Sequence, residues 1–580
     1  MRKLIKALGP IVKKAILSGR LFSAKAELVP PLEDIQAGWD VSVKVSDGSN
    51  ILINIFKSKK ALAENRPLPV VMCAHPYDNH LVPALGKTPL KGAPQQYRLI
   101  NQIGKPKFST LTSWESPDPN FWVSNDYIVV NMNMPGYGGS TGEASTFNRN
   151  QSRAYYEVIE WIAEQEWCDG NVGLNGVSFL AITQYHVAAC RDYDNKAPKA
   201  LKCISPWEGI TDMYRDISNM GGIPEDGFPT FWWSTEVKTA MTADPQLFID
   251  KQGGVPADWI KKRPFFDEFW EEKRAPLEHI EIPILTCVSF SDVGLHTNGS
   301  YRSFTEVKSK DKWMYTHRDG KWDVYYSKEV QELTLRFMDY YLKGKKGNGW
   351  KETPRVRLEV RSSRDVIHEV RGEKEWPLAR TSYDKYYLTA DNKLRLDPIK
   401  QRKELTYNGK KGQQDFKVTF DQGTEITGHA KLKVWMEVRS PKGNLDDFNL
   451  YVVLNKYDKQ GKRLPFYGTV GSKEDVICRA YMRASLRALD KKKSTDIIPY
   501  QSFKACQRLD RNEIVCLEIP FPPTSVFFHA GETLELSLAS YEIFQSAPFF
   551  KDNELNKGGE QVIHLGGSYN SFLQLPIIPK

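Results

Sequence analysis

The sequence contains no run of about eighteen apolar residues, and none of its eight cysteines forms a C-x-x-C pair. The first absence excludes an ordinary transmembrane helix. The second argues against a structural zinc site and against a disulfide framework, and it predicts free thiols in a reducing compartment. We therefore expect a cytoplasmic protein that needs no metal or other cofactor.

The body of the chain also lacks an excess of either charge. The formal net charge is +9, but residues 1–26 alone contain seven Lys or Arg and no acid. The remainder is nearly neutral, so we expect no nucleic-acid partner. Residues 1–26 place apolar side chains roughly at helical spacing, which predicts a basic amphipathic arm over residues 1–36. Three roles stay open for it: packing on the parent domain, organellar import, or peripheral contact with a membrane.

The 580 residues are too many for one hydrophobic core, so we expect two or three domains. In 37–205 and 281–348 short apolar strands alternate with helices, which predicts a doubly wound, mostly parallel sheet. The Trp-rich segment 206–280 interrupts this pattern and indicates a helical insertion. It is either a cap over the carboxyl edge of the sheet or a helical elaboration with no ligand role. Residues 349–580 are strands separated by turns, which predicts an all-β sandwich of jelly-roll type.

One short segment, GNVGLNGVSFLAITQYHVAA at 170–189, has the strand–turn–helix context of a nucleophile elbow. Its serine, Ser178, is either a nucleophile or only a small residue at a tight junction. In α/β-hydrolases an acid and then a histidine follow the serine along the chain, each at a strand end. Asp292 comes just past the predicted strand IPILTCVSF, in the place of the acid, although Asp is also a common helix N-cap.

Only ten histidines occur in the chain, and one of them fits this order. His317 follows the short strand in KWMYTHRDG and precedes a polar loop, whereas His296 comes too early to follow the acid's strand. We therefore predict that His317 takes the proton of Ser178 and that Asp292 orients and stabilises the imidazole.

An oxyanion hole is also required, and the sequence offers two donors for it. One is the backbone N–H of Phe179, directly after the nucleophile. The other is the hydroxyl of Tyr77, which follows the early strand VVMCA; a packed aromatic at a strand end is the alternative for this residue.

Several segments resemble the CocE/NonD hydrolases, which include esterases, α-amino-acid ester hydrolases and X-prolyl dipeptidyl aminopeptidases. They are GVSFLAITQ, PGYGGSTGE, LDDFNLYVVL and SYNSFLQLPIIP. The resemblance covers most of residues 40–580 and implies an α/β-hydrolase domain, a helical cap and a jelly-roll domain. It also implies that Tyr77, in HPYD, completes the oxyanion hole. The chain departs from the family where Phe179 replaces the usual Tyr and Ala181 a Gly.

We expect a serine hydrolase that cleaves a small-molecule ester or amide through an acyl-enzyme. The cap residues Trp207, Trp232 and Trp233 favour an apolar acyl group and hence an esterase. An X-Pro dipeptidyl aminopeptidase would instead need acids for the substrate ammonium, and the candidates are Glu208, Asp212, Glu225, Asp226 and Glu236. An acyltransferase and a non-catalytic binding protein on the same fold are further alternatives, and a homo-oligomer stays open.

Overall fold

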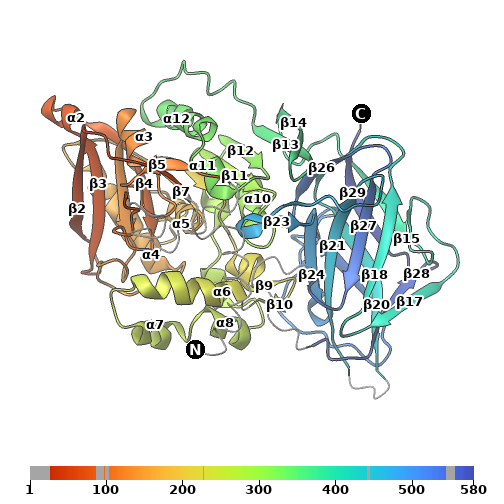
Figure 1. Cartoon of the computed structure of the whole chain (residues 1–580). Coiled ribbons are helices and arrows are strands. Elements are labelled where there is room, and N and C mark those ends of the chain that lie inside the picture. The colour runs from red at the N-terminus through yellow and green to blue at the C-terminus, as the bar shows by residue number, and fades with distance from the viewer. Residues whose placement is uncertain are drawn as a thin grey trace.

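The computed structural model describes residues 26–85, 97, 104–225, 227–440, 445–543 and 555–579, so residues 1–25 of the predicted N-terminal arm lie outside them. Figure 1 shows two parts side by side, an α/β part formed by the first half of the chain and a β part formed by the second. None of the described helices is long and apolar enough to cross a bilayer.

A twisted, mostly parallel sheet forms the centre of the α/β part. Only its first two strand pairings, β2 with β3 and β3 with β6, are antiparallel. In spatial order the strands are β2 (Ile35–Lys44), β3 (Asn50–Ser58), β6 (Ile128–Asn133), β4 (Leu68–His75), β7 (Cys168–Val177), β8 (Leu201–Trp207), β11 (Ile284–Ser289) and β12 (Lys312–His317).

Both faces of this sheet are buried, which explains why its strands are continuous apolar runs. On β4, Val70 and Met72 belong to one core, whereas Val71 belongs to the core on the opposite face. Successive side chains of a strand point to opposite faces, so each strand supplies both cores. The helices of this part are α2 (Lys59–Ala63), α3 (Pro119–Ser124), α4 (Arg149–Ala163), α5 (Phe179–Ala188), α10 (Thr297–Glu306), α11 (Lys321–Tyr325) and α12 (Lys328–Leu342).

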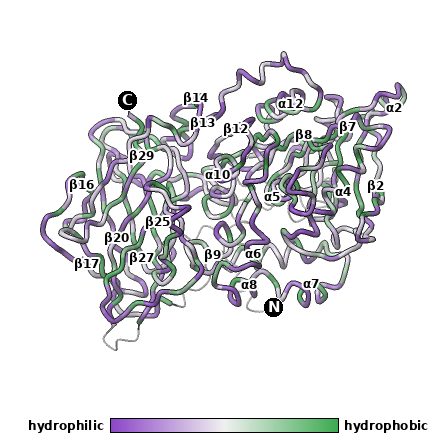
Figure 2. The backbone as a smooth tube through the Cα atoms, turned by 180° about the vertical axis from the view of Figure 1, so that it is seen from behind, coloured by the Kyte–Doolittle hydropathy of each residue, from purple (hydrophilic) through white to green (hydrophobic). Residues whose placement is uncertain are grey.

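Helix α5 is the most deeply buried helix that bears on the site. Every one of its residues is buried, and Figure 2 shows it mostly in the hydrophobic colour. A helix that is buried on all sides is held by the whole core and not by one packed face. The first turn of α5 is therefore a rigid support for the residue before it.

The segment between β8 and β11 contains short helices and two very short strands, and it packs below the sheet in Figure 1. Its elements are η3 (Tyr214–Ser218), β9 (Asn219–Met220), β10 (Ile223–Pro224), α6 (Gly227–Trp232), η4 (Trp233–Val237), η5 (Lys238–Ala240), α7 (Pro245–Gln252), α8 (Pro256–Lys262), α9 (Glu268–Glu272) and η6 (Leu277–His279).

The second part consists of strands around one apolar core. A four-stranded sheet runs in the order β18 (Gln413–Thr419), β27 (Thr533–Ala539), β21 (Asn449–Tyr457) and β24 (Cys478–Arg483). The other strands are β13 (Val356–Ser363), β14 (Val366–Glu373), β15 (Ser382–Leu388), β16 (Leu394–Arg395), β17 (Lys403–Asn408), β19 (Thr424–Gly428), β20 (Lys431–Arg439), β22 (Phe466–Gly468), β23 (Ser472–Asp475), β25 (Val515–Pro520), β26 (Thr524–Phe528), β28 (Glu560–Leu565) and β29 (Phe572–Ile578).

The two parts are in close contact. Strand β13 pairs with β12 of the first part and with β26 of the second, so hydrogen-bonded strands run from one part into the other. The buried Arg318, just after β12, donates to the carbonyl oxygens of Val476 and Ile477 at 2.8 and 2.6 Å. The β part therefore braces the loops at the carboxyl edge of the sheet.

Candidate active site

Ser178 lies at the sharp junction between β7 and α5. Its backbone angles are φ 58° and ψ −115°, a region that non-glycine residues rarely adopt and that costs roughly 1–3 kcal/mol. Its N–H donates to the carbonyl of Trp207 at 3.0 Å, which fixes the turn to the neighbouring strand. Gly176 allows this turn, because a Cβ atom there would lie 2.6 Å from Cβ of Leu180. The hydroxyl is thus held at the top of the sheet, partly open to solvent.

The imidazole that meets this hydroxyl belongs to His296. Its Nε2 lies 3.1 Å from Oγ of Ser178, and its Nδ1 lies 2.5 Å from Oδ2 of Asp292. Asp292 and His296 are each 2% exposed, so both polar contacts are shielded from water. Serine, imidazole and carboxylate form one hydrogen-bonded array, in which Ser178 and Asp292 occupy the places that the sequence predicted.

The prediction that His317 faces Ser178 is wrong. The Nε2 of His317 instead lies 3.0 Å from Oε1 of Glu208, and its Nδ1 accepts the backbone N–H of Asp319 at 3.2 Å. Both ring nitrogens therefore have other partners, and the residue is 1% exposed.

The order of the strands explains this correction. His317 is the last residue of β12, and two strands, β8 and β11, lie between β12 and β7. Neighbouring strands are about 4.8 Å apart, so the ends of β7 and β12 are separated by about 14 Å. His296 instead lies on the loop that follows β11, and this loop crosses back toward Ser178.

A local signal for His296 was present in the sequence. Asp292 and His296 have i,i+4 spacing just before a helix, and such residues meet on one helical turn. The turn exists, because the N–H groups of Leu295, His296 and Thr297 all donate to the carbonyl of Asp292. The prediction of His317 assumed that the base follows a strand of its own, and for that reason it passed over the Asp292–His296 pair.

Lys321, whose side chain is mostly buried, places a positive charge beside the carboxylate of the array. Nζ of Lys321 lies 2.8 Å from Oδ2 of Asp292 and 3.9 Å from Oε2 of Glu208. Burial alone would raise the pKa of Asp292, but Lys321 and His296 outweigh burial and hold it well below its ordinary value. Burial, with the Lys321 ammonium, lowers the pKa of His296. The imidazole is therefore kept neutral and able to accept a proton.

Phe179 directly follows Ser178, and the second predicted oxyanion donor, Tyr77, contacts Phe179. As the first residue of α5, Phe179 has no carbonyl within its helix to bond, so its N–H is directed outward. The ring of Tyr77 makes an edge contact with the ring of Phe179, with centroids 6.0 Å apart. Burial, with the charges of Glu115 and Glu236, raises the pKa of Tyr77 well above its ordinary value, so its phenol keeps the proton that it would donate.

The four residues predicted for a substrate pocket have different surroundings. Trp232 reaches the site, because its Nε1 donates to the hydroxyl of Tyr77 at 3.1 Å. Trp233 packs on Phe248 within the insertion, with ring centroids 4.3 Å apart. Trp207 is fully buried beneath the site, and Glu208 is the partner of a histidine. Of these four side chains, that of Trp232 forms a hydrogen bond with a proposed oxyanion donor.

Two further buried carboxyls, Glu115 and Glu236, interact electrostatically with Tyr77 and Lys321, and only Glu236 was among the residues that the sequence offered. Burial raises the pKa of Glu115 to about 8 and that of Glu236 to about 7, although Lys321 lowers both. One oxygen of Glu115 accepts from Nε1 of Trp322 at 3.1 Å, and the other has no hydrogen-bond partner among the described residues. These groups are therefore largely protonated in mildly acidic solution.

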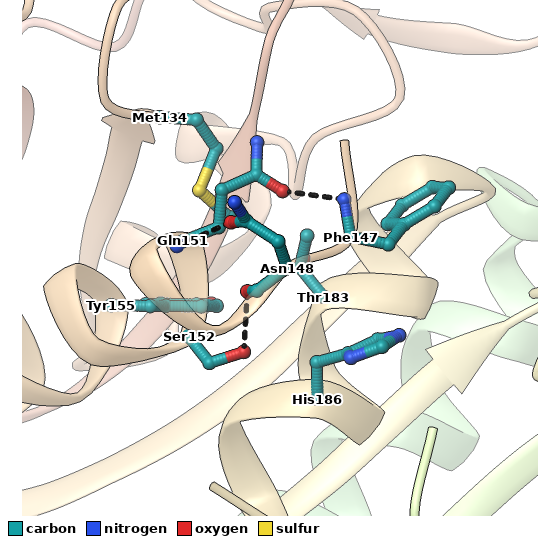
Figure 3. Close-up of a pocket in the computed structure, with 8 residues that line it drawn as sticks. All are labelled: Met134, Phe147, Asn148, Gln151, Ser152, Tyr155, Thr183 and His186. Atoms are coloured by element: carbon teal, nitrogen blue, oxygen red, sulfur yellow. Dashed lines mark hydrogen bonds between the residues drawn. The ribbon is translucent and has the colours of Figure 1, made fainter. Parts of the chain in front are cut away.

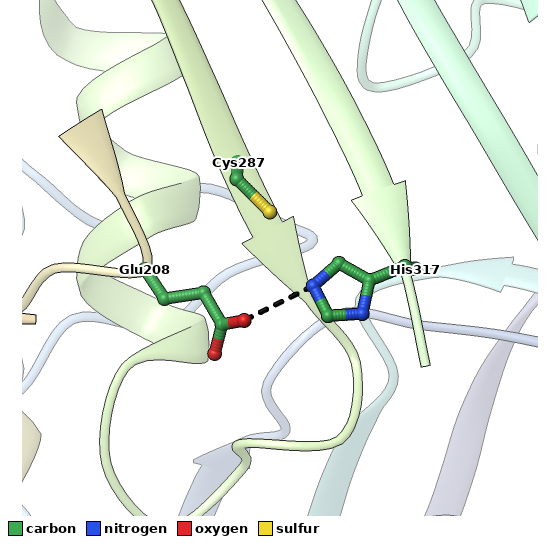
Figure 4. A group of neighbouring side chains, drawn as sticks. All are labelled: Glu208, Cys287 and His317. Atoms are coloured by element: carbon green, nitrogen blue, oxygen red, sulfur yellow. Dashed lines mark hydrogen bonds and ion pairs between the residues drawn. The ribbon is translucent and has the colours of Figure 1, made fainter. Parts of the chain in front are cut away.

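Among the described residues, two sets of side chains have the composition of a metal site. Glu208 lies close to Cys287 and His317 in one set, and to Asp292 and His296 in the other; Figure 4 shows the first, drawn from the ends of neighbouring strands. The Lys321 ammonium already serves as the cation between Glu208 and Asp292. Burial raises the pKa of the Cys287 thiol well above its ordinary value, which disfavours the thiolate that a metal requires. Neither set therefore fits a resident metal.

A small cavity lies away from this array, between α4 and α5. Its volume is about 10 Å³, room for about one water molecule, and it is lined by the eight residues drawn in Figure 3. None of Ser178, Asp292 and His296 is among them. At this volume the cavity is too small to hold a substrate.

Comparisons with known proteins match both parts of the chain. Residues 47–320 match the family model of X-Pro dipeptidyl-peptidase (S15 family), and residues 348–574 match the model of the X-Pro dipeptidyl-peptidase C-terminal non-catalytic domain. The chain is similar to cocaine esterase from Rhodococcus sp., with 24% identity over 60% of this chain and 62% of that protein. It thus spans less than two thirds of that relative's length.

Solved structures extend the likeness to nearly the whole chain. An α-amino acid ester hydrolase shares the fold, with a TM-score of 0.67 and 16% identity over 94% of this chain and 97% of the other. A CocE/NonD family hydrolase from Staphylococcus aureus superposes with a TM-score of 0.85 and 34% identity, over 94% of each chain. The α/β-hydrolase part, the C-terminal β part and this likeness together identify the chain as a hydrolase that belongs to the CocE/NonD family.

Proposed function

We propose that this protein is a carboxylic-ester hydrolase that works through an acyl-enzyme on Ser178, with His296 as the base and Asp292 as its partner. The single observation that carries the proposal is the array from Oγ of Ser178 to Nε2 of His296, 3.1 Å, and from Nδ1 to Asp292, 2.5 Å. A strained serine at a helix start, next to a neutral imidazole, is a nucleophile with a base in place.

The chemistry proceeds in two halves. Oγ of Ser178 attacks the ester carbonyl carbon while its proton passes to Nε2 of His296, and the C=O electron pair moves to oxygen. The tetrahedral intermediate then expels the alkoxide, which takes that proton and leaves as the alcohol. Water attacks the acyl-enzyme through the same base, and the acid leaves with Ser178 restored.

Two donors are proposed for the oxyanion, the N–H of Phe179 and the hydroxyl of Tyr77. Support comes from the protonated state of the phenol and from its bond with Trp232, which holds the ring in place. Tyr77→Phe should lower kcat by roughly 10- to 1,000-fold. It should also cost about 1–3 kcal/mol of stability, because the buried N–H of Trp232 loses its acceptor. An unchanged kcat would remove Tyr77 from the oxyanion hole.

We propose that segment 206–280 is a cap that selects the acyl group, over a catalytic domain of residues 37–205 and 281–348. The bond from Trp232 to Tyr77 brings α6 over the elbow, and an indole there favours an apolar or aromatic acyl group. We also propose that residues 349–580 form a jelly-roll domain. Its role in this protein is to support the loops of the site.

A fluorophosphonate probe tests the nucleophile directly. We expect the wild type to be labelled and Ser178→Ala to remain unlabelled, with Ser113→Ala, another buried serine, as the matched control that keeps labelling. Labelling of Ser178→Ala would contradict the proposal. A panel of p-nitrophenyl acetate, p-nitrophenyl benzoate and X-Pro-anilides then separates the esterase from the dipeptidyl-peptidase.

The buried carboxyls favour one second candidate, hydrolysis of aminoacyl esters or amides. Glu115 and Glu236 face the site with pKa values of about 8 and 7, and a substrate ammonium beside them would convert both to the charged form. In that case amino-acid esters should be hydrolysed faster than simple esters, and Glu236→Gln should abolish this difference in rate. Equal rates on acetyl and aminoacyl esters would exclude this candidate.

A further inference from the structure

Lys321 lies near the carboxylates of both histidine–carboxylate pairs, Asp292 of the reacting array and Glu208 beside His317. It is the first residue of α11, and its side chain is 12% exposed. Its Nζ lies 2.8 Å from Asp292 and 3.9 Å from Glu208. The ammonium therefore sits between two buried carboxylates that belong to different loops.

The hydrogen bonds around the ammonium define which nitrogen of each ring carries a proton. Nδ1 of His317 accepts the N–H of Asp319, so its Nε2–H donates to Glu208. Nε2 of His296 faces the Ser178 hydroxyl, so its Nδ1–H donates to Asp292. Lys321 lies 3.0 Å from that same Nδ1, and it therefore meets an N–H and bonds Asp292 instead.

The charged groups that face this cluster come from five elements or their adjoining loops. They are Asp292 after β11, Glu208 after β8, Lys321 on α11, Glu115 in the loop before α3 and Glu236 on η4. The last two are protonated in acidic solution because burial raises their pKa values to about 8 and 7. One ammonium then compensates two carboxylates, so removing any of the three charges changes the potential at His296.

We propose that Lys321 is a positioning residue of the Ser178–His296–Asp292 array, fixed behind Asp292 by the buried Glu208–His317 pair. The proposal rests on the proposed function. The ammonium opposes a second positive charge on His296, and Glu208 partly offsets it. The lysine thereby keeps the base free of a proton at acidic pH, while its bond to Asp292 holds that carboxylate toward the imidazole.

Two variants should move the pH dependence in opposite directions. In Lys321→Met the opposing charge is gone, so the acidic limb of kcat/KM should move to higher pH by about one unit. In Glu208→Gln the offsetting charge is gone while the acceptor for His317 remains, so the limb should move to lower pH. A merely structural role would lower activity in both variants without shifting their limbs in opposite directions.

The experiment measures kcat/KM for p-nitrophenyl acetate from pH 4.5 to 9 and, in parallel, the rate of fluorophosphonate labelling. Lys328→Met, an exposed lysine seven residues along the chain with 87% of its side chain open to solvent, is the matched control and should leave both profiles unchanged. If Lys321→Met does not fold, Glu208→Gln alone decides, since a limb that stays or rises overturns the proposal.

The outcome also separates this inference from the proposed function. If Ser178→Ala is still labelled, the proposed function fails. If Ser178→Ala shows no labelling while the acidic limbs of kcat/KM in Lys321→Met and Glu208→Gln do not move apart, only the role of Lys321 fails. Opposite shifts of the two acidic limbs, together with no labelling of Ser178→Ala, support both the proposed function and the role of Lys321.

Discussion

Two buried histidine–carboxylate pairs lie within one cluster of this molecule. His296 with Asp292 and His317 with Glu208 are all at most 2% exposed, and the same lysine lies near both carboxylates. The pairs differ in what the second ring nitrogen meets. In the first pair it faces the hydroxyl of Ser178, and in the second it accepts a backbone N–H. A buried imidazole–carboxylate pair alone therefore does not define a catalytic base; the partner of its outer nitrogen does.

The largest expected effect separates the two pairs by activity. His296→Ala should lower kcat by about 10,000-fold or more, because the base is lost, as in triads of this type. His317→Ala should lower kcat by less than about 100-fold, because that ring touches no reacting atom. Ester hydrolysis with purified variants measures both, and His80→Ala, an exposed histidine, is the control. Equal losses in the two variants would break the comparison.

The two histidine substitutions should rank in the reverse order when the free energy of unfolding is measured. His317→Ala leaves Glu208 with only a lysine at 3.9 Å, and an uncompensated buried charge costs about 3–5 kcal/mol. His296→Ala should cost about 1–3 kcal/mol, because Asp292 keeps its lysine at 2.8 Å. Urea unfolding at pH 7 measures the two free energies. A smaller loss for His317→Ala would mean that Glu208 finds another partner.

A third buried carboxyl, Glu115, has no imidazole partner among the described residues. It therefore shows how a buried carboxyl titrates when no histidine accompanies it. Its pKa in the folded state is about 8, above the ordinary 4.5, so the folded protein holds a proton that the unfolded chain releases. The wild type should therefore lose stability as pH rises from 4.5 through 8.

Glu115→Gln should remove this loss and be more stable than the wild type by roughly 3–4 kcal/mol at pH 8, with little difference at pH 4.5. Urea unfolding across this pH range gives the measurement, and Glu64→Gln, at an exposed position, is the control. A pH-independent difference would show that Glu115 is not protonated in the folded protein.

The smallest expected effect concerns the loop of the first pair. Between Asp292 and His296, the N–H of Gly294 donates to Oγ1 of Thr469 in the β part at 3.0 Å. Thr469→Val should cost about 1–3 kcal/mol and lower kcat a few-fold, because this buried N–H loses its acceptor. Thr419→Val, on the exposed side of the same part, is the matched control. If kcat stays constant, the β part does not position the loop.

Much of the site was readable from local patterns. The strand–turn–helix context of Ser178 and the place of Asp292 after an apolar strand both follow from short segments, and both residues lie where expected. Phe179 follows the serine directly, and Tyr77 packs against the Phe179 ring. The predicted pocket tryptophans were not separable in this way, because Trp207 belongs to β8 and Trp233 packs on Phe248, whereas Trp232 reaches the site.

The sequence by itself determined the sheet, the elbow and the division into an α/β part and a β part, because hydrophobic periodicity and turn residues act over a few residues. Tertiary structure alone decided which histidine meets Ser178. That choice depends on strand order: β8 and β11 separate His317 from the elbow, while the loop after β11 returns His296 to it. The same order brings Lys321 between carboxylates of two loops, a placement that no spacing along the chain encodes.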